Sequence, residues 1–155
     1  MPFDLRHLTT DDVGAMEALS TMFGEAFNDM ETYTEHRPSA SYVRRLLGSE
    51  SFIALAAHKN GEVVGGIAAY ELRKFEQERS EIYLYDLAVS VAHRREGIAT
   101  ALIEALKGIA AERGAYVIFV QADTGVEDAP AIELYSTLGT RDEVLHFDIA
   151  IDGHA

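Results

Sequence analysis

The segment Arg94-Arg95-Glu96-Gly97-Ile98-Ala99-Thr100 joins a strand-like run to an amphipathic helix. The residues before it, 81–89, are mostly β-branched, aromatic and aliphatic, which is typical of a buried strand. In the residues after it, 98–113, apolar side chains recur at helical spacing. A strand, a short turn and a helix predict a helix start whose free backbone N–H groups point to one place. The helix dipole favours an anion there.

The turn itself has the composition of a phosphate site. Gly97 and Ala99 are small enough for phosphate oxygens to approach the backbone, and Arg94 and Arg95 can add charge-assisted hydrogen bonds. The alternative is a plain structural turn, which any α/β protein contains. Because two cations at a helix start are unfavourable unless an anion compensates them, the segment predicts a phosphate-bearing cofactor.

Size and composition indicate one globular domain, expected over residues 1–155. The chain has 155 residues, of which 48% are hydrophobic and 25% charged. No apolar run approaches the roughly 20 residues that cross a bilayer, and the N-terminal residues lack the order of a secretory signal. The absence of cysteine excludes disulfides and thiolate metal ligands. These features predict a cytoplasmic protein.

Charge restricts the partners. The balance of 13 Lys and Arg against 26 Asp and Glu gives a formal net charge of −13. Such a field repels nucleic acid and anionic membranes and attracts a cationic substrate, although solubility alone also accounts for an acidic composition. The histidines have no metal-ligand spacing, so we expect no metal site.

The pattern before the phosphate turn predicts mixed α and β structure without linkers or repeats. Gly65-Gly66 indicates a bulge or a close backbone approach within a strand. In order, we expect a strand over 3–8, a helix capped by 9–12, a polar loop over 28–37, a helix from Ser39 to Gly48, and strands over 51–58 and 62–72 joined by a hairpin at Asn60-Gly61.

The pattern after the turn alternates helices and strands. The strands over 81–89 and 116–121 are joined through a helix, so we expect them to run parallel. In order, we expect that helix to end at Gly114, followed by the strand over 116–121, a loop over 124–128, a helix from Pro130 to Leu138, and a last strand over 146–151.

Two blocks match a known family. Residues 94–99 fit Arg/Gln-x-x-Gly-x-Gly/Ala, and residues 131–139 fit Ala-x-x-x-Tyr-x-x-x-Gly. With these blocks in this order of elements, the chain resembles the GCN5-related N-acetyltransferases (GNAT) over essentially its whole length. The resemblance implies an α/β (α+β) GNAT fold, with a mixed central sheet, a splayed parallel strand pair and flanking helices. It also implies acetyl-CoA as the co-substrate.

Further segments resemble one branch of that family, the aminoglycoside (gentamicin) 3-N-acetyltransferases. Because they lie outside the cofactor motif, they bear on the substrate as well as on the fold. The branch implies acetylation of the 3-amino group of an aminoglycoside antibiotic, which inactivates the drug. The segments are FIALAA at 52–57, KFEQ at 74–77, SEIYLYDLAV at 80–89, GAYVI at 114–118 and HFDI at 146–149.

The resemblance implies a cofactor site on the strand and turn. Backbone groups of Leu87, Ala88 and Val89 would hold the pantetheine arm, and one amide near Leu87 would donate to the acetyl carbonyl. The pyrophosphate would bind the turn residues Arg94, Arg95, Gly97, Ile98, Ala99 and Thr100.

Two side chains are candidates for proton transfer. Asp86 is acidic in an otherwise apolar and aromatic strand, and a buried carboxylate has the raised pKa that suits a general base for an ammonium group. The alternative is an aspartate that points outward at a strand end. Tyr135 matches the family's tyrosine that protonates the departing thiolate. Its alternative is a core tyrosine with a hydrated hydroxyl.

A cationic acceptor requires an acidic pocket. Carboxylates gather in the C-terminal third and in the loop over 28–37, and each alone could be solvated surface. We expect the acceptor to bind through Tyr85, Asp123, Asp142, Glu143 and Asp148.

Two other functions stay open. The same donor could serve a polyamine, another small amine or a protein amino group. Alternatively, the chain could be a non-catalytic module that binds CoA or a polycation. Some members of the fold dimerise through edge strands, so a homodimer is a candidate assembly.

Overall fold

A computed structural model describes residues 3–153 of the chain. These residues fall into two compact units, one up to Gln121 and one from Ala122 onward. The first unit contains a five-stranded sheet with helices on both faces, and the second contains a short helix and an extended segment. Within the described residues, no helix is long and apolar enough to cross a membrane.

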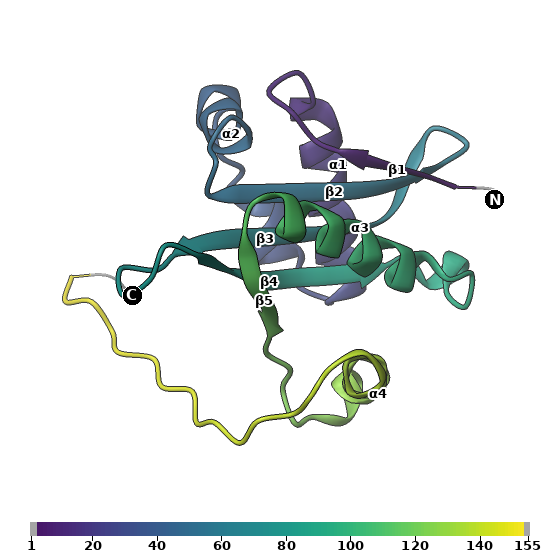
Figure 1. Cartoon of the computed structure of the whole chain (residues 1–155). Coiled ribbons are helices and arrows are strands. Elements are labelled where there is room, and N and C mark those ends of the chain that lie inside the picture. Colours follow the sequence, from purple (N-terminus) through teal and green to yellow (C-terminus); the bar gives the residue numbers. More distant parts are fainter. Residues whose placement is uncertain (1–2, 154–155) are drawn as a thin grey trace. The chain divides into compact units, whose positions relative to one another are not determined.

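The sheet of the first unit has the strand order β1-β2-β3-β4-β5 (Figure 1). The first four strands pair antiparallel, and β5 pairs parallel with β4. This mixed sheet with one parallel pair confirms the expected fold class. The strands are β1 (Asp4–His7), β2 (Phe52–Lys59), β3 (Glu62–Arg73), β4 (Ser80–Val89) and β5 (Ala115–Val120).

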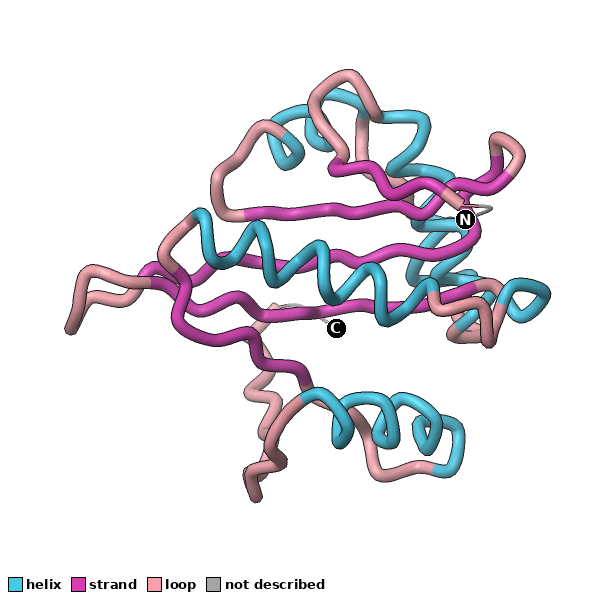
Figure 2. Tube along the Cα trace, turned by 45° about the vertical axis from the view of Figure 1, so that its right-hand side comes forward, coloured by secondary structure: helices cyan, strands magenta, loops and turns pink. Residues whose placement is uncertain are grey.

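Helices cover both faces of this sheet, as Figures 1 and 2 show for α3 lying along the strands. Neighbouring strand residues point to opposite faces, and two glycines show which helix lies on which. A Cβ built on Gly66 would meet Leu19 of α1, whereas one built on Gly65 would lie 3.0 Å from Ile98 of α3. The α2 helix packs into the same core cluster as α1. The helices are α1 (Val13–Ala26), α2 (Ala40–Leu47) and α3 (Ile98–Glu112).

Local signals in the sequence are confirmed at the turns and caps. Asn60 and Gly61 both have positive φ, at 52° and 82°, as a tight hairpin requires. Gly114 has φ of 76° where α3 ends. Ser39 caps α2, since its side chain accepts a hydrogen bond from the backbone N–H of Tyr42 at 3.2 Å.

Two local expectations are corrected. The segment 28–37, expected as a loop, contains the π-helical turn η1 (Glu31–Glu35), which the polar composition did not reveal. Asp12 stands at the N-cap of α1, but its carboxylate accepts from the backbone N–H of Thr9 at 2.8 Å and makes no capping bond to the helix. The Asp12 carboxylate therefore closes the turn that precedes the helix.

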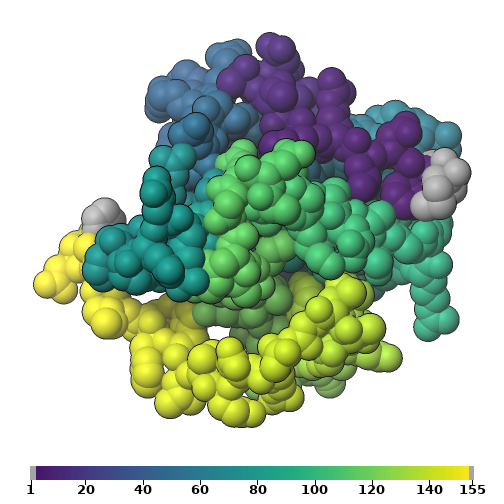
Figure 3. Space-filling model, viewed as in Figure 1, coloured from purple at the N-terminus to yellow at the C-terminus, as the bar shows by residue number. Residues whose placement is uncertain are grey.

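The second unit contains η3 (Val126–Asp128) and α4 (Ala129–Leu138), with Pro130 in the first turn of α4 as expected. The strand expected over 146–151 is wrong, because residues 140–151 form no strand. A strand requires a neighbour to complete its backbone hydrogen bonds, and no strand in the described residues pairs with this one. The segment is drawn in yellow in Figure 3. Its exposed apolar side chains are Val144, Leu145, Phe147, Ile149 and Ile151.

The Gly65-Gly66 pair confirms both expectations for it. The β2–β3 register shifts between Ala57 and His58, which leaves Val64 as an extra residue of a bulge. A Cβ on Gly66 would lie 2.6 Å from the carbonyl oxygen of Leu55, and it would also overlap Leu19. The absence of a side chain here lets α1 approach the sheet closely.

We expect Gly66→Ala to lower the free energy of unfolding by about 1–3 kcal/mol, because a methyl group at this position overpacks the α1 contact. Urea denaturation measures the change. The matched control is Gly108→Ala in the middle of α3, where no atom lies within 4 Å of the added Cβ. It is expected to stabilise the protein by up to about 1 kcal/mol through helix propensity. Equal effects of the two substitutions would contradict the close approach.

Candidate active site

An extra residue in β4 determines where the candidate base points. In the ladder with β3, Leu84 pairs with Ala69 and Asp86 pairs with Ala68, so Tyr85 has no partner. Such a bulge shifts the alternation of side chains by one position. Asp86 therefore shares the α1 face with Ala68, which belongs to the α1 core cluster, while Leu84 is buried on the α3 face.

Asp86 is held by a residue far away in sequence. The hydroxyl of Tyr33 donates to Oδ2 of Asp86 at 2.9 Å. Burial raises the pKa of the Asp86 carboxyl above its ordinary value, and the hydrogen bond from Tyr33 opposes part of this rise. Burial and the Asp86 charge raise the pKa of Tyr33 in turn, so its hydroxyl stays protonated. A half-buried carboxylate with a raised pKa is suited to accept a proton from an amine.

A row of aromatic rings lies beside Asp86 on this face. The ring centroids of Tyr70 and Tyr85 are 5.7 Å apart, those of Tyr85 and Tyr83 are 5.3 Å apart, and Tyr83 stacks on Phe119 at 4.6 Å. Tyr85 is 56% exposed. Ring faces of this kind can pack against a sugar and attract an ammonium group.

The ladder between β4 and β5 stops just before the bulge. Their ladder begins at Ser80 with Ala115 and ends at Leu84 with Val120. Backbone groups of alternate residues point to each edge of a strand, so part of the backbone of 85–89 has no partner strand in the described sheet. Leu87, Ala88 and Val89 lie in this freed stretch. Apart from the carbonyl oxygen of Val89, which accepts from Arg94, the backbone groups that face away from β3 here are available to an extended ligand.

The turn 94–100 presents free amides at the start of α3. Gly97 has φ of 81° and Arg95 has φ of 65°, so the backbone turns sharply ahead of the helix. The first intrahelical bond there runs from the N–H of Ala101 to the carbonyl of Gly97 at 3.0 Å. The amides of Ile98, Ala99 and Thr100 precede it and have no acceptor within the helix.

The side chains of the turn contact three different parts of the first unit, namely the core, strand β4 and the β2–β3 hairpin. Ile98 is 1% exposed, so only its backbone can face a ligand. Arg94 directs Nε to the carbonyl oxygen of Val89 at 3.2 Å. Glu96 pairs with Lys59 of the β2–β3 hairpin at 2.9 Å, which attaches the turn to the sheet.

The other predicted site residues belong to the second unit. Tyr135 is half-buried on α4. The four acidic residues predicted to bind the acceptor, Asp123, Asp142, Glu143 and Asp148, are exposed. Glu143 lies 3.9 Å from Arg141, and Asp148 pairs with His146 at 2.9 Å. Of the residues predicted for proton transfer and acceptor binding, Tyr85 and Asp86 are the two that lie in the first unit.

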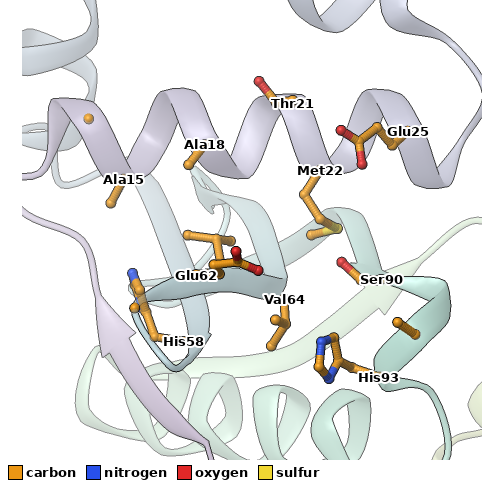
Figure 4. Close-up of a pocket in the computed structure, with 14 residues that line it drawn as sticks. Ala15, Ala18, Thr21, Met22, Glu25, His58, Glu62, Val64, Ser90 and His93 are labelled. Carbon is orange, nitrogen blue, oxygen red and sulfur yellow. The ribbon is translucent and has the colours of Figure 1, made fainter.

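An open groove of about 830 Å³ lies on the α1 side of the first unit (Figure 4). Residues of α1, of the β2–β3 hairpin and of the segment 90–93 line it, including Glu25, His58, Glu62 and His93. Asp86 is not among the lining residues. The chemistry indicated by the carboxylate therefore lies at the bulge and not in this groove.

Sequence reasoning missed Tyr33 as part of the site. The only local signal was an aromatic residue within an acidic segment. Its contact with Asp86 joins residues 53 positions apart, so no short motif could reveal it.

Comparison with known proteins agrees with this geometry. Residues 16–140 match the acetyltransferase (GNAT) family. The crystal structure of an aminoglycoside acetyltransferase from an uncultured soil metagenomic sample is similar, with 68% identity and a TM-score of 0.96 over 98% of this chain and 100% of that one. A second such enzyme, solved in complex with sisomicin, has 27% identity and a TM-score of 0.88 over 97% of each chain.

A curated relative extends the comparison to animals. N-acetyltransferase family 8 member 3 of Rattus norvegicus is 31% identical over 113 residues, which are 70% of this chain and 48% of that protein. The chain spans about half the length of the curated relatives it matches. The match over residues 16–140 shows that the chain belongs to the acetyltransferase (GNAT) family, whose enzymes use acetyl-CoA.

Proposed function

We propose that this enzyme transfers the acetyl group of acetyl-CoA to the 3-amino group of aminoglycoside antibiotics and so inactivates them. The observation that carries the proposal is Asp86, a half-buried carboxylate on the α1 face next to the exposed ring of Tyr85. The similar soil proteins, both aminoglycoside acetyltransferases, support the acceptor class. The net charge of −13 also favours a polycationic acceptor. The proposed form is a cytoplasmic homodimer.

In this proposal, the donor lies along the backbone of β4 and the start of α3. Backbone groups of Leu87, Ala88 and Val89 bind the pantetheine arm in the gap that β5 leaves. The pyrophosphate accepts hydrogen bonds from the amides of 98–100, next to Gly97, and from the guanidinium groups of Arg94 and Arg95. Bound acetyl-CoA supplies the acetyl group.

Proton transfers are assigned to two residues. Asp86 takes a proton from the acceptor ammonium group, which frees the nitrogen lone pair to form the amide bond. A backbone N–H near Leu87 donates to the acetyl oxygen as negative charge develops on it. Tyr135 gives a proton to the sulfur as the carbon–sulfur bond breaks. Tyr85, Asp123, Asp142, Glu143 and Asp148 bind the other hydroxyl and ammonium groups of the acceptor.

An acceptor panel tests the proposal. Thiol release from acetyl-CoA is measured with gentamicin, sisomicin, kanamycin and spermidine, and the acetylated nitrogen is mapped in the product. Acetylation of the 3-amino group of gentamicin or sisomicin is expected. Turnover with spermidine alone would assign a polyamine acceptor, and failure with every aminoglycoside would refute the proposal.

We expect Asp86→Asn to lower kcat/KM by roughly 10²–10⁴-fold, the usual range for loss of a general base. Calorimetric titration should show unchanged CoA affinity. The melting temperature at pH 7.5 should not fall, because folding raises the pKa of this carboxyl and the ionised form is therefore disfavoured in the native state. Unchanged kcat/KM in this variant would favour a non-catalytic binding module.

We expect Gly97→Ala to weaken CoA binding by roughly tenfold, because a residue with a Cβ is strained at φ of 81° and would shift the amides of α3. The matched control is Gly114→Ala at the other end of α3, where φ is 76° and the surroundings are equally open. Both variants should lose about 1 kcal/mol of stability. Equal CoA affinities in the two variants would argue against a pyrophosphate site at Gly97.

A further inference from the structure

We infer that Tyr33 is a positioning residue for the catalytic base: its hydroxyl binds Oδ2 of Asp86 and leaves Oδ1 to take the proton from the acceptor amine. This inference rests on the proposed function, because it assigns Tyr33 a task in the same proton transfer. The hydrogen bond that carries it is 2.9 Å long and joins η1 to β4.

Tyr33 is fixed at both its backbone and its ring. Its carbonyl oxygen accepts a hydrogen bond from the side chain of Ser20 at 2.7 Å. Its ring lies 6.0 Å from that of Phe23 and 5.7 Å from that of Phe27, measured between centroids. A ring packed on this aromatic pair has little freedom to turn, so its hydroxyl reaches Asp86 from one direction only.

The contacts of Asp86 leave one oxygen available. Within the described residues, the Asp86 carboxylate accepts one hydrogen bond. The donor is the Tyr33 hydroxyl and the accepting atom is Oδ2. An ionised carboxylate has two acceptor oxygens. Tyr33 therefore sets the orientation of the carboxylate and does not block the oxygen that an amine would approach.

Among residues 3–153, no cation interacts with this pair. The groups that interact electrostatically with Tyr33 or Asp86 are the tyrosines Tyr70, Tyr83 and Tyr85 and the carboxylate of Asp29. None of these groups is a cation, so none can stabilise the ionised form of Asp86 in place of the hydrogen bond from Tyr33. Removal of the Tyr33 hydroxyl should therefore act directly on the proton affinity of Asp86.

The segment that carries Tyr33 is itself acidic. Glu31 and Glu35 of η1 are exposed, and Asp29 accepts from the backbone N–H of Thr32 at 3.2 Å. A cationic acceptor attracted to these carboxylates would contact the same turn that orients the base. Binding and deprotonation of the acceptor would then be linked through Tyr33.

We expect Tyr33→Phe to move the acid limb of the kcat/KM profile upward by roughly one pH unit. The direction follows because the hydrogen bond favours ionised Asp86, so its loss raises the pKa of that carboxyl. Well above the limb, kcat/KM should still fall several-fold, because the base is no longer oriented. The KM for acetyl-CoA should not change.

The matched control is Tyr116→Phe. Tyr116 also donates to a carboxylate, Oε1 of Glu81, at 3.0 Å, so this variant loses the same kind of hydrogen bond elsewhere in the sheet. Its acid limb should coincide with that of the unchanged protein. A shift of equal size in both variants would mean that the effect is general, and it would overturn the inference.

Carboxyl-carbon NMR titration of Asp86 in the unchanged protein, Tyr33→Phe and Tyr116→Phe decides the contact without any acceptor. A rise in the pKa of Asp86 in Tyr33→Phe alone, matched by the kinetic limb, would establish the positioning role. An unchanged titration, or one that the kinetic limb does not follow, would overturn it. If the unchanged protein acetylates no amine, the proposed function fails, and the titration still reports whether Tyr33 binds Asp86.

Discussion

The extra residue at Tyr85 is the constraint on which both halves of the site depend. A regular strand would place Asp86 on the same face as Leu84, under α3 and within the apolar core. The bulge moves its carboxylate to the α1 face. The ladder with β5 also ends at Leu84, directly before the bulge. One irregularity thus marks the place where the proposed base reaches the α1 face and where β4 loses its β5 neighbour.

Packing of α1 then determines what meets that carboxylate. Gly66 allows Leu19 to lie against the sheet, which fixes the height of α1 above β3. The chain leaves α1 through Phe27 and turns back in η1, where the Tyr33 ring packs at a tilt against that of Phe27 and its hydroxyl reaches Asp86. The absence of a side chain at Gly66 on β3 allows the close position of α1. That position in turn bears on where Tyr33 meets the carboxylate of Asp86 on β4.

The two sides of the site use different chemistry. On the donor side the backbone does most of the binding, through the freed edge of β4 and the amides before Ala101. Such a site constrains glycine positions and φ angles more than side-chain identity. On the acceptor side the side chains decide, namely the carboxylate of Asp86, the hydroxyl of Tyr33 and the rings beside them. Changes in acceptor preference are therefore expected there, while the donor side stays the same.

The sequence by itself determined the features that arise from a few neighbouring residues. Helical periodicity gave α3, Asn60-Gly61 gave the hairpin, and Gly97 gave the turn ahead of the helix, because each signal depends on local φ and on spacing within a few residues. It also singled out Asp86, since an acid in an apolar strand is conspicuous.

Tertiary structure decided the rest. The bulge at Tyr85 appears only in the register of β4 against β3, and the bond from Tyr33 to Asp86 joins residues 53 positions apart. The alternating segment 146–151 gave a wrong strand for the same reason, because alternation describes one chain whereas a strand requires a second one beside it. Local sequence specifies which secondary structure each segment can form. Only contacts between distant segments specify which strand or side chain it pairs with.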